Sequence, residues 1–175
     1  MKGLGIAVCA ALAGVVLGGC GANYTWRPGV PQGMRTVAVP TFRNESELQE
    51  VGAVASRQVL REFQREGTFK IAMQGDAALE VQGTVVSVRG GAVSYSRRFA
   101  TRLASCEATA NATVTFVDKR RGRVLVNNRP YTAVATYVSG QDSTTALRDV
   151  SGRLMDDLAR QIVDDALNLD FGKED

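Results

Sequence analysis

The chain has 175 residues, with 21 lysines and arginines against 18 acidic residues and no histidine. A formal charge of +3 is too small to argue for nucleic-acid binding across the whole surface, so any basic site has to be local. Because histidine is the commonest general base and the commonest metal ligand, its absence disfavours hydrolase triads and zinc sites. We expect no catalytic centre, no metal and no cofactor.

Residues 1–19 have the layout of an export signal. Lys2 gives a positive start, residues 6–16 are apolar, and small residues lead to Cys20. The apolar run is shorter than the ~20 residues that cross a bilayer, so we expect no membrane span. The stretch LGGC that ends at Cys20 resembles the lipobox of bacterial lipoproteins, in which the cysteine is acylated and becomes the first mature residue. The resemblance implies a lipid anchor on Cys20. The alternative is an ordinary cysteine after a plain signal.

The three cysteines are Cys9, Cys20 and Cys106, so the body of the chain has one thiol and no intramolecular disulfide. Without histidine, Cys106 is expected to be a small core residue on a strand rather than a nucleophile. Residues 20–34 are rich in proline and glycine and predict a tether.

The first expected strand covers residues 35–42, where β-branched residues alternate and Pro40 suggests an edge or a strand end. Residues 44–47 contain the cap and acidic residues that begin helices, and apolar residues recur at helical spacing until Gly67. We therefore expect a helix from this cap to Gly67. The strand before this helix and the strand after it are candidates for parallel neighbours.

Four further patterns predict strands at residues 69–73, 78–89, 106–117 and 123–138. In 106–117, apolar residues from Cys106 to Phe116 alternate with polar ones, as in a half-buried strand. In 78–89, the odd-numbered positions from Leu79 to Ser87 form one face and the even-numbered positions to Val88 form the other. Residues 127–130 interrupt the last pattern, so it forms two pieces or one strand with an irregular start.

A final amphipathic helix follows the cap residues 142–144, and residues 171–175 form a polar tail. The order of elements predicts an α+β protein: a two-layer sandwich with a mostly antiparallel sheet of four to five strands and two helices packed on one face. Residues 35–170 are expected to form one domain.

These patterns together resemble the LptE family, the lipopolysaccharide-assembly lipoproteins of the Gram-negative outer membrane. The resemblance rests on LGGC, on Tyr24 and residues 27–29 of the tether, on TVAVPTFRNESE and GDAALEVQGTVVSV, and on the closing helix. It implies a non-enzymatic, lipid-anchored protein on the periplasmic side of the outer membrane. Such a protein plugs an LptD-type β-barrel translocon and assists delivery of lipopolysaccharide to the outer leaflet.

The segment VAVPTFRNES also resembles lipoprotein activators of cell-wall synthases and curli-secretion-type lipoproteins. Those proteins are regulators or pore subunits and usually carry more alternating helices, whereas one strong helix follows the strands here. The lipopolysaccharide-assembly interpretation is therefore favoured, and a periplasmic enzyme is the third alternative.

Two basic clusters fall between expected strands and are the candidate contacts for lipopolysaccharide. They are Arg97, Arg98 and Arg102 in the first, and Lys119, Arg120, Arg121 and Arg123 in the second. Arginine and lysine at loop tips can pair with the phosphates and carboxylates of an anionic glycolipid. The alternative is that both clusters are solvated hairpin tips.

Overall fold

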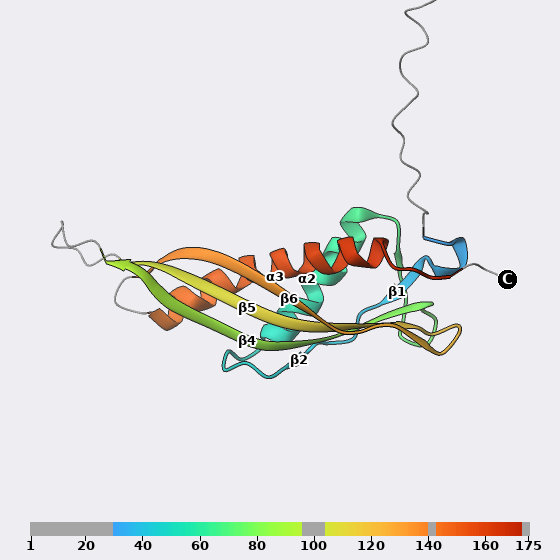
Figure 1. Cartoon of the computed structure of the whole chain (residues 1–175), viewed down its shortest axis with the longest axis horizontal. Helices are drawn as coiled ribbons and strands as arrows, with labels where there is room; N and C mark the ends of the chain where they lie inside the picture. Colours follow the sequence, from blue (N-terminus) through green and yellow to red (C-terminus); the bar gives the residue numbers. More distant parts are fainter. Residues whose placement is uncertain (1–29, 96–103, 140–142, 173–175) are drawn as a thin grey trace, which may run out of the picture.

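The computed structural model describes residues 30–95, 104–139 and 143–172 (Figure 1). In chain order the elements are η2 (Gln32–Met34), β1 (Thr36–Ala38), β2 (Arg43–Asn44), α2 (Val51–Glu66), β3 (Lys70–Ile71), β4 (Leu79–Tyr95), β5 (Ala104–Asp118), β6 (Arg123–Ser139) and α3 (Ser143–Leu167). The predicted α+β class with two helices is confirmed for these residues. Among them, no helix has the length and apolar character needed to cross a membrane.

The sheet is mixed and has six strands, in the order β3-β1-β4-β5-β6 with β2 also beside β4. The long strands β4, β5 and β6 are antiparallel. However, β1 runs parallel to β3 and β4, and β2 runs parallel to β4. The expectation of a mostly antiparallel sheet of four to five strands is therefore wrong. The chain crosses back through α2 between β1 and β3, and this crossover makes those two strands the parallel neighbours that the sequence suggested.

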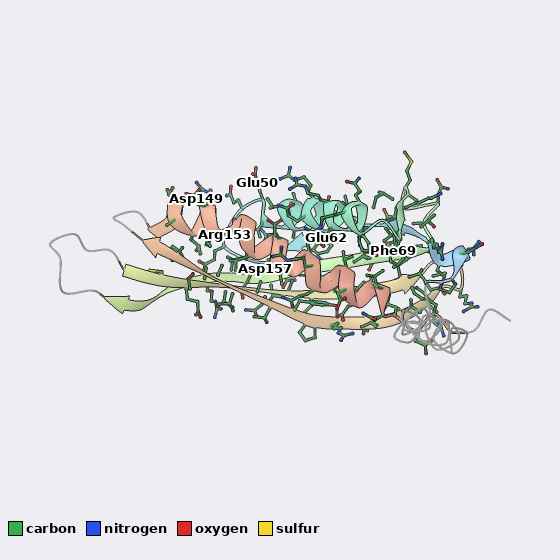
Figure 2. All side chains as sticks on the ribbon, turned by 90° about the horizontal axis from the view of Figure 1, so that it is seen from above. Glu50, Glu62, Phe69, Asp149, Arg153 and Asp157 are labelled. Atoms are coloured by element: carbon green, nitrogen blue, oxygen red, sulfur yellow. The ribbon has the colours of Figure 1, made fainter. Side chains whose placement is uncertain are left out.

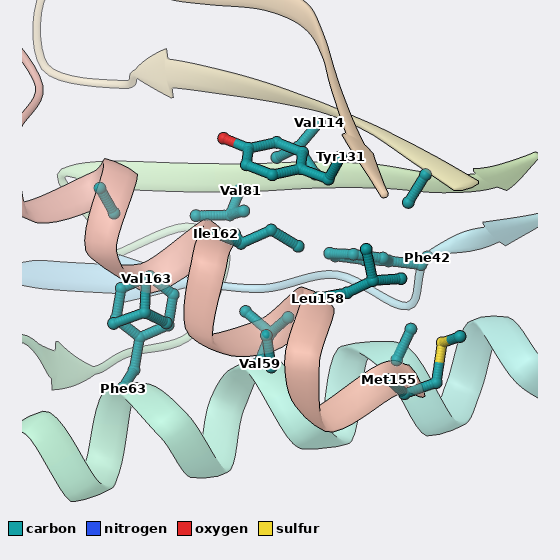
Figure 3. Packing of buried hydrophobic residues seen from close by; sticks show 14 of the residues in the cluster. Phe42, Val59, Phe63, Val81, Val114, Tyr131, Met155, Leu158, Ile162 and Val163 are labelled. Atoms are coloured by element: carbon teal, nitrogen blue, oxygen red, sulfur yellow. The ribbon is translucent and has the colours of Figure 1, made fainter. Parts of the chain in front are cut away.

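Both helices pack on one face of the sheet, and they lie side by side (Figure 2). The inward side of α3 carries an unbroken apolar stripe, formed by Val150, Leu154, Leu158, Ile162 and Ala166. Figure 3 shows Leu158 and Ile162 between the sheet residue Val81 and the α2 residues Val59 and Phe63. The core is thus one layer of side chains shared by the sheet and the two helices.

Strand β5 has the alternation that its sequence predicts. The inward residues are Cys106, Ala108, Ala110, Ala112, Val114 and Phe116, and all of them are buried. Cys106 is a free, buried cysteine, as expected for a core residue. Its partner β6 is one continuous strand with register shifts near Phe116, which decides between the two alternatives for residues 123–138.

Strand β4 changes faces in its middle. Leu79, Val81 and Val85 are fully buried, but the pairing with β5 shifts register between Val85 and Ser87. Because a bulge inserts one residue, the side chains after it move to the opposite face, until a second register shift between Ala92 and Ser94. Val88 is consequently buried, and the expected alternation beyond Val85 is wrong.

The segment before α2 is more irregular than predicted. Residues 35–42 do not form a single strand: the chain leaves the sheet after Ala38 and pairs again at Arg43. The cap residue Asn44 holds a turn instead of a helix, because its Oδ1 accepts the Ser46 N–H at 3.0 Å and its Nδ2 donates to the Leu48 carbonyl at 2.7 Å. The helix therefore begins at Val51, later than expected.

Candidate functional site

The second basic cluster lies on the β5–β6 hairpin, and its turn is held by Asp118. One oxygen, Oδ1, accepts the backbone N–H groups of Arg120 and Arg121 at 3.0 and 3.1 Å. Gly122 completes the turn with a φ of 61°, a conformation that side chains disfavour. Because Asp118 is fully buried, the turn is anchored to the body of the protein and its cationic side chains are displayed from a fixed base.

Lys119 is paired with a buried acid. Its Nζ lies 3.3 Å from Oε2 of Glu80, a side chain that is only 1% exposed. Burial alone would raise the pKa of this carboxyl. Hydrogen bonds from Gln82 at 2.7 Å and Gln74 at 3.0 Å, together with the Lys119 charge, outweigh burial and hold the pKa below its usual range. Lys119 thus has a structural role in addition to its charge.

Arg121 and Arg123 hold the end of the chain. Arg121 Nη1 donates to the Phe171 carbonyl at 2.8 Å, and Arg123 Nη2 donates to the same oxygen at 3.1 Å. Phe171 is buried, although its sequence position suggests a polar tail. These two arginines therefore hold the segment after α3 against the β5–β6 hairpin.

Arg120 lines a small cavity of about 200 Å³ between three segments of the chain. The lining residues are Pro31, Met34, Arg120, Arg121, Phe171 and Gly172. The first lining residue, Pro31, follows Cys20 by eleven positions, and eleven residues span at most about 40 Å. This length is the upper limit on the distance between Cys20 and the cavity.

The two basic clusters belong to opposite ends of the sheet. The first cluster, with Arg97, Arg98 and Arg102, connects β4 to β5 and lies outside the described residues, as does Cys20. The second follows the other end of β5. A strand of this length spans about 45 Å at 3.3 Å per residue, so the strand ends that carry the clusters are far apart.

The sequence analysis placed Glu80 among the even-numbered positions of residues 78–89 and did not identify it as a buried, paired acid. Glu80 is one of the residues that line a groove of about 560 Å³ on the face that has no helices. Hydroxyl and amide side chains line this groove, including Thr84, Thr113 and Thr115. The sequence signal for a buried acid was a glutamate within a strand pattern, with Gln74 and Gln82 nearby in the chain. The contacts of Glu80 with Gln74 and Lys119 are formed only in the tertiary structure.

The described residues 30–95, 104–139 and 143–172 contain no group of three acidic or cysteine side chains that could hold a metal ion. What the hairpin offers is cationic hydrogen-bond donors on a rigid turn, next to a small cavity. Such an arrangement suits contact with an anion.

The described residues thus form an α+β fold with a mixed sheet and two helices on one face. A basic hairpin lies beside residues 31–34, at the start of the described chain. The sequence profile of the LptE family, described as lipopolysaccharide-assembly, matches residues 34–166. Because this match covers most of the chain, the protein belongs to the LptE family. No curated protein sequence matches the chain significantly.

Two solved structures have a similar fold. Protein XCC0632 from Xanthomonas campestris is 14% identical, with a TM-score of 0.52 over 76% of this chain and 83% of that chain. A homolog of neuraminyllactose-binding hemagglutinin from Helicobacter pylori is 11% identical, with a TM-score of 0.51 over 83% of this chain and 87% of that chain. At these identities the likeness extends to the fold alone.

Proposed function

We propose that this protein is an outer-membrane lipoprotein that binds and plugs an LptD-type β-barrel translocon and assists lipopolysaccharide insertion into the outer leaflet. The observation that carries the proposal is the LptE-family match over residues 34–166, preceded in the same chain by the lipobox-like LGGC at Cys20. The protein acts without catalysis, by occupying the barrel and guiding the glycolipid. Acyl chains on Cys20 hold it to the periplasmic side of the membrane.

Copurification tests the partner. The full chain with a C-terminal affinity tag is captured from detergent-solubilised outer membrane, and the bound proteins are identified by mass spectrometry. We expect a large β-barrel in stoichiometric amount. Recovery of a peptidoglycan synthase in place of a barrel would contradict the proposal and favour the activator interpretation.

The basic hairpin supports a role in contacting the anionic glycolipid, and Arg120 is its best probe. Lys119, Arg121 and Arg123 have structural contacts, so substitutions there would combine two effects. Reversing the charge with Arg120→Glu should weaken lipopolysaccharide binding about twofold to fivefold at low salt, and less at high salt, because exposed ion pairs contribute ~0.2–1 kcal/mol.

The first cluster is probed by the pair Arg97→Glu with Arg98→Glu, measured in the same way. Arg57→Glu is the control, because Arg57 is an exposed arginine that belongs to α2 and to neither basic cluster. Circular dichroism checks the folding of each variant. If affinity and its salt dependence stay unchanged in both cluster variants, the clusters are solvated hairpin tips and the glycolipid contact lies elsewhere.

A further inference from the structure

Strand β4 has one edge that is paired for only part of its length. On that edge β1 pairs with Leu79 and Glu80, β2 pairs as far as Val85, and Glu45 N–H donates to the Val85 carbonyl at 2.9 Å. Beyond Val85 the strand continues to Tyr95 with β5 as its one pairing strand among the described residues. Figure 1 shows this part of β4 as the margin of the sheet beyond β2. An unpaired margin offers backbone groups to another strand.

The other margins of the sheet are partly covered or short. Along β6, the Thr132 carbonyl accepts a hydrogen bond from Gln161 at 3.0 Å and the Thr136 carbonyl accepts one from Arg153 at 3.3 Å. Both donors belong to α3, which therefore covers part of that edge. At the opposite margin, β3 consists of Lys70–Ile71 and is too short to pair with a long strand. Beyond Val85, the open edge of β4 is long and accepts no such hydrogen bond from α3 among the described residues.

A groove follows the open edge. It has a volume of about 460 Å³, and its lining residues are Glu45, Ser46, Glu47, Val86, Ser87, Val88, Arg89, Gly90 and Leu147. One wall is the turn that Asn44 holds through its hydrogen bonds to Ser46 and Leu48. This wall is held by the protein's own hydrogen bonds. Binding therefore does not have to order it, and the entropy cost of binding is smaller.

The wall of the groove is acidic. Glu45 and Glu47 are exposed, and neither forms an ion pair with another residue in the described part of the chain. Arg89 is the single cationic residue that lines the groove. Two uncompensated carboxylates beside unpaired strand backbone fit an extended polypeptide that carries lysine or arginine.

We propose that the edge of β4 from Val86 to Gly91 binds an extended, lysine- or arginine-bearing segment of the barrel partner by β-strand addition. Backbone hydrogen bonds to β4 hold the added strand, and Glu45 and Glu47 pair with its cationic side chains. The inference rests on the proposed function for the identity of the partner, whereas the binding surface rests on the sheet pairing and the groove.

Photo-cross-linking in the intact complex tests the contact. A benzophenone amino acid replaces Val86, which is 40% exposed beside the open edge, and in a matched control it replaces Val134, which is 50% exposed on β6. The full chain is irradiated in cells and captured from solubilised outer membrane, and the linked peptide is sequenced. We expect a link from position 86 to one barrel segment containing lysine or arginine, at least several times more abundant than any link from position 134.

Charge reversal tests the acidic wall. Glu45→Lys with Glu47→Lys should lower the yield of the position-86 link about threefold to tenfold, because two attractive pairs become repulsive. The control, Asp76→Lys with Asp164→Lys, makes the same change of charge at exposed sites outside the groove and should leave the yield unchanged. Equal losses in both double variants would overturn the role of the wall.

The two proposals fail in different ways. If the barrel copurifies but position 86 links to nothing, to lipid or to a second copy of this chain, strand addition is wrong and the proposed function stands. If no barrel copurifies with the wild-type chain, the proposed function fails at that step. Position 86 linking to a non-barrel polypeptide would overturn the identity of the partner.

Discussion

Glu80 is a buried carboxylate on β4, and it pairs with Lys119 of the β5–β6 hairpin. Its pKa is lowered in the folded protein relative to an unfolded value of 4.5, because hydrogen bonds from Gln82 and Gln74 and the charge of Lys119 exceed the effect of burial. A carboxyl with a lowered folded pKa stabilises the fold above the unfolded pKa. That contribution is lost as the pH falls through the folded pKa.

Replacement of this acid should change the pH dependence of stability. Glu80→Gln keeps the shape but removes the charge, so we expect a loss of about 1.5–3 kcal/mol near pH 7, and a smaller difference from wild type at a pH well below 4.5. Urea unfolding of wild type and variant at both pH values measures the difference in the free energy of unfolding. Glu107→Gln, an exposed change on β5, serves as the control. A Glu80→Gln deficit that is the same at both pH values would contradict this assignment.

Cys20 is the residue on which membrane attachment depends in this account. Three acyl chains give stable anchoring at ~0.8 kcal/mol per buried CH₂, so Cys20→Ala should move the protein out of the outer-membrane fraction. Cell fractionation in high salt, with intact mass measurement of the wild-type N-terminus, tests this. If the Cys20→Ala protein still sediments with outer membrane and carries acyl mass at its N-terminus, the anchor assignment is wrong.

At the scale of elements, the β1–β2 segment packs closely against both β4 and α2. Phe42 is buried, and its ring lies where a side chain on Gly83 would be, since a Cβ there would come within 2.3 Å of it. The same segment approaches α2, because a Cβ on Gly52 would lie 2.3 Å from the Phe42 carbonyl oxygen. Two glycines thus allow β2 to sit between β4 and the start of the helix.

Filling the space beneath Phe42 should therefore destabilise the fold. Gly83→Ala is expected to lower the free energy of unfolding by about 1–3 kcal/mol through overpacking. Gly91→Ala lies on the same strand with no atom within 4 Å of the added Cβ, so its effect should stay within about 0.5 kcal/mol. Chemical denaturation of both variants makes the comparison, and equal effects would show that the Phe42 contact is not tight.

The elements also show which features a sequence can predict. The alternation in β5 and the stripe on α3 were predicted because each element presents one regular face to the core. The bulge after Val85 was not, because a one-residue insertion leaves no local signal and is set by pairing with β5. Asn44 was misassigned for a related reason: the side chain that caps a helix can also hold a turn.

At the scale of the whole molecule, the sequence predicted two helices on a sheet and suggested β1 and β3 as parallel neighbours, but it did not predict that β1 and β2 pair with β4 in parallel. These strands are two or three residues long, so periodicity cannot fix their bounds or their pairing partners. The basic residues of the candidate site were identifiable as local charge. Their partners were not, because Phe171 and Glu80 are remote in sequence from the hairpin residues that contact them.

The whole-molecule arrangement connects anchor, hairpin and open edge. The chain enters the domain beside the hairpin, whereas the open part of β4 runs toward the opposite end of the sheet (Figure 1). The proposed anchor on Cys20 would hold the first of these ends near the membrane and leave the long edge of β4 to a partner. Such a layout suits a subunit seated in a larger assembly.

The central claim is tested most directly by depleting the protein in its own bacterium and measuring how much newly made lipopolysaccharide reaches the cell surface. We predict that surface delivery falls steeply before growth stops, and that the wild-type chain, but not Cys20→Ala, restores it. Unchanged delivery of lipopolysaccharide in fully depleted cells, with a fall in cell-wall synthesis instead, would contradict the account.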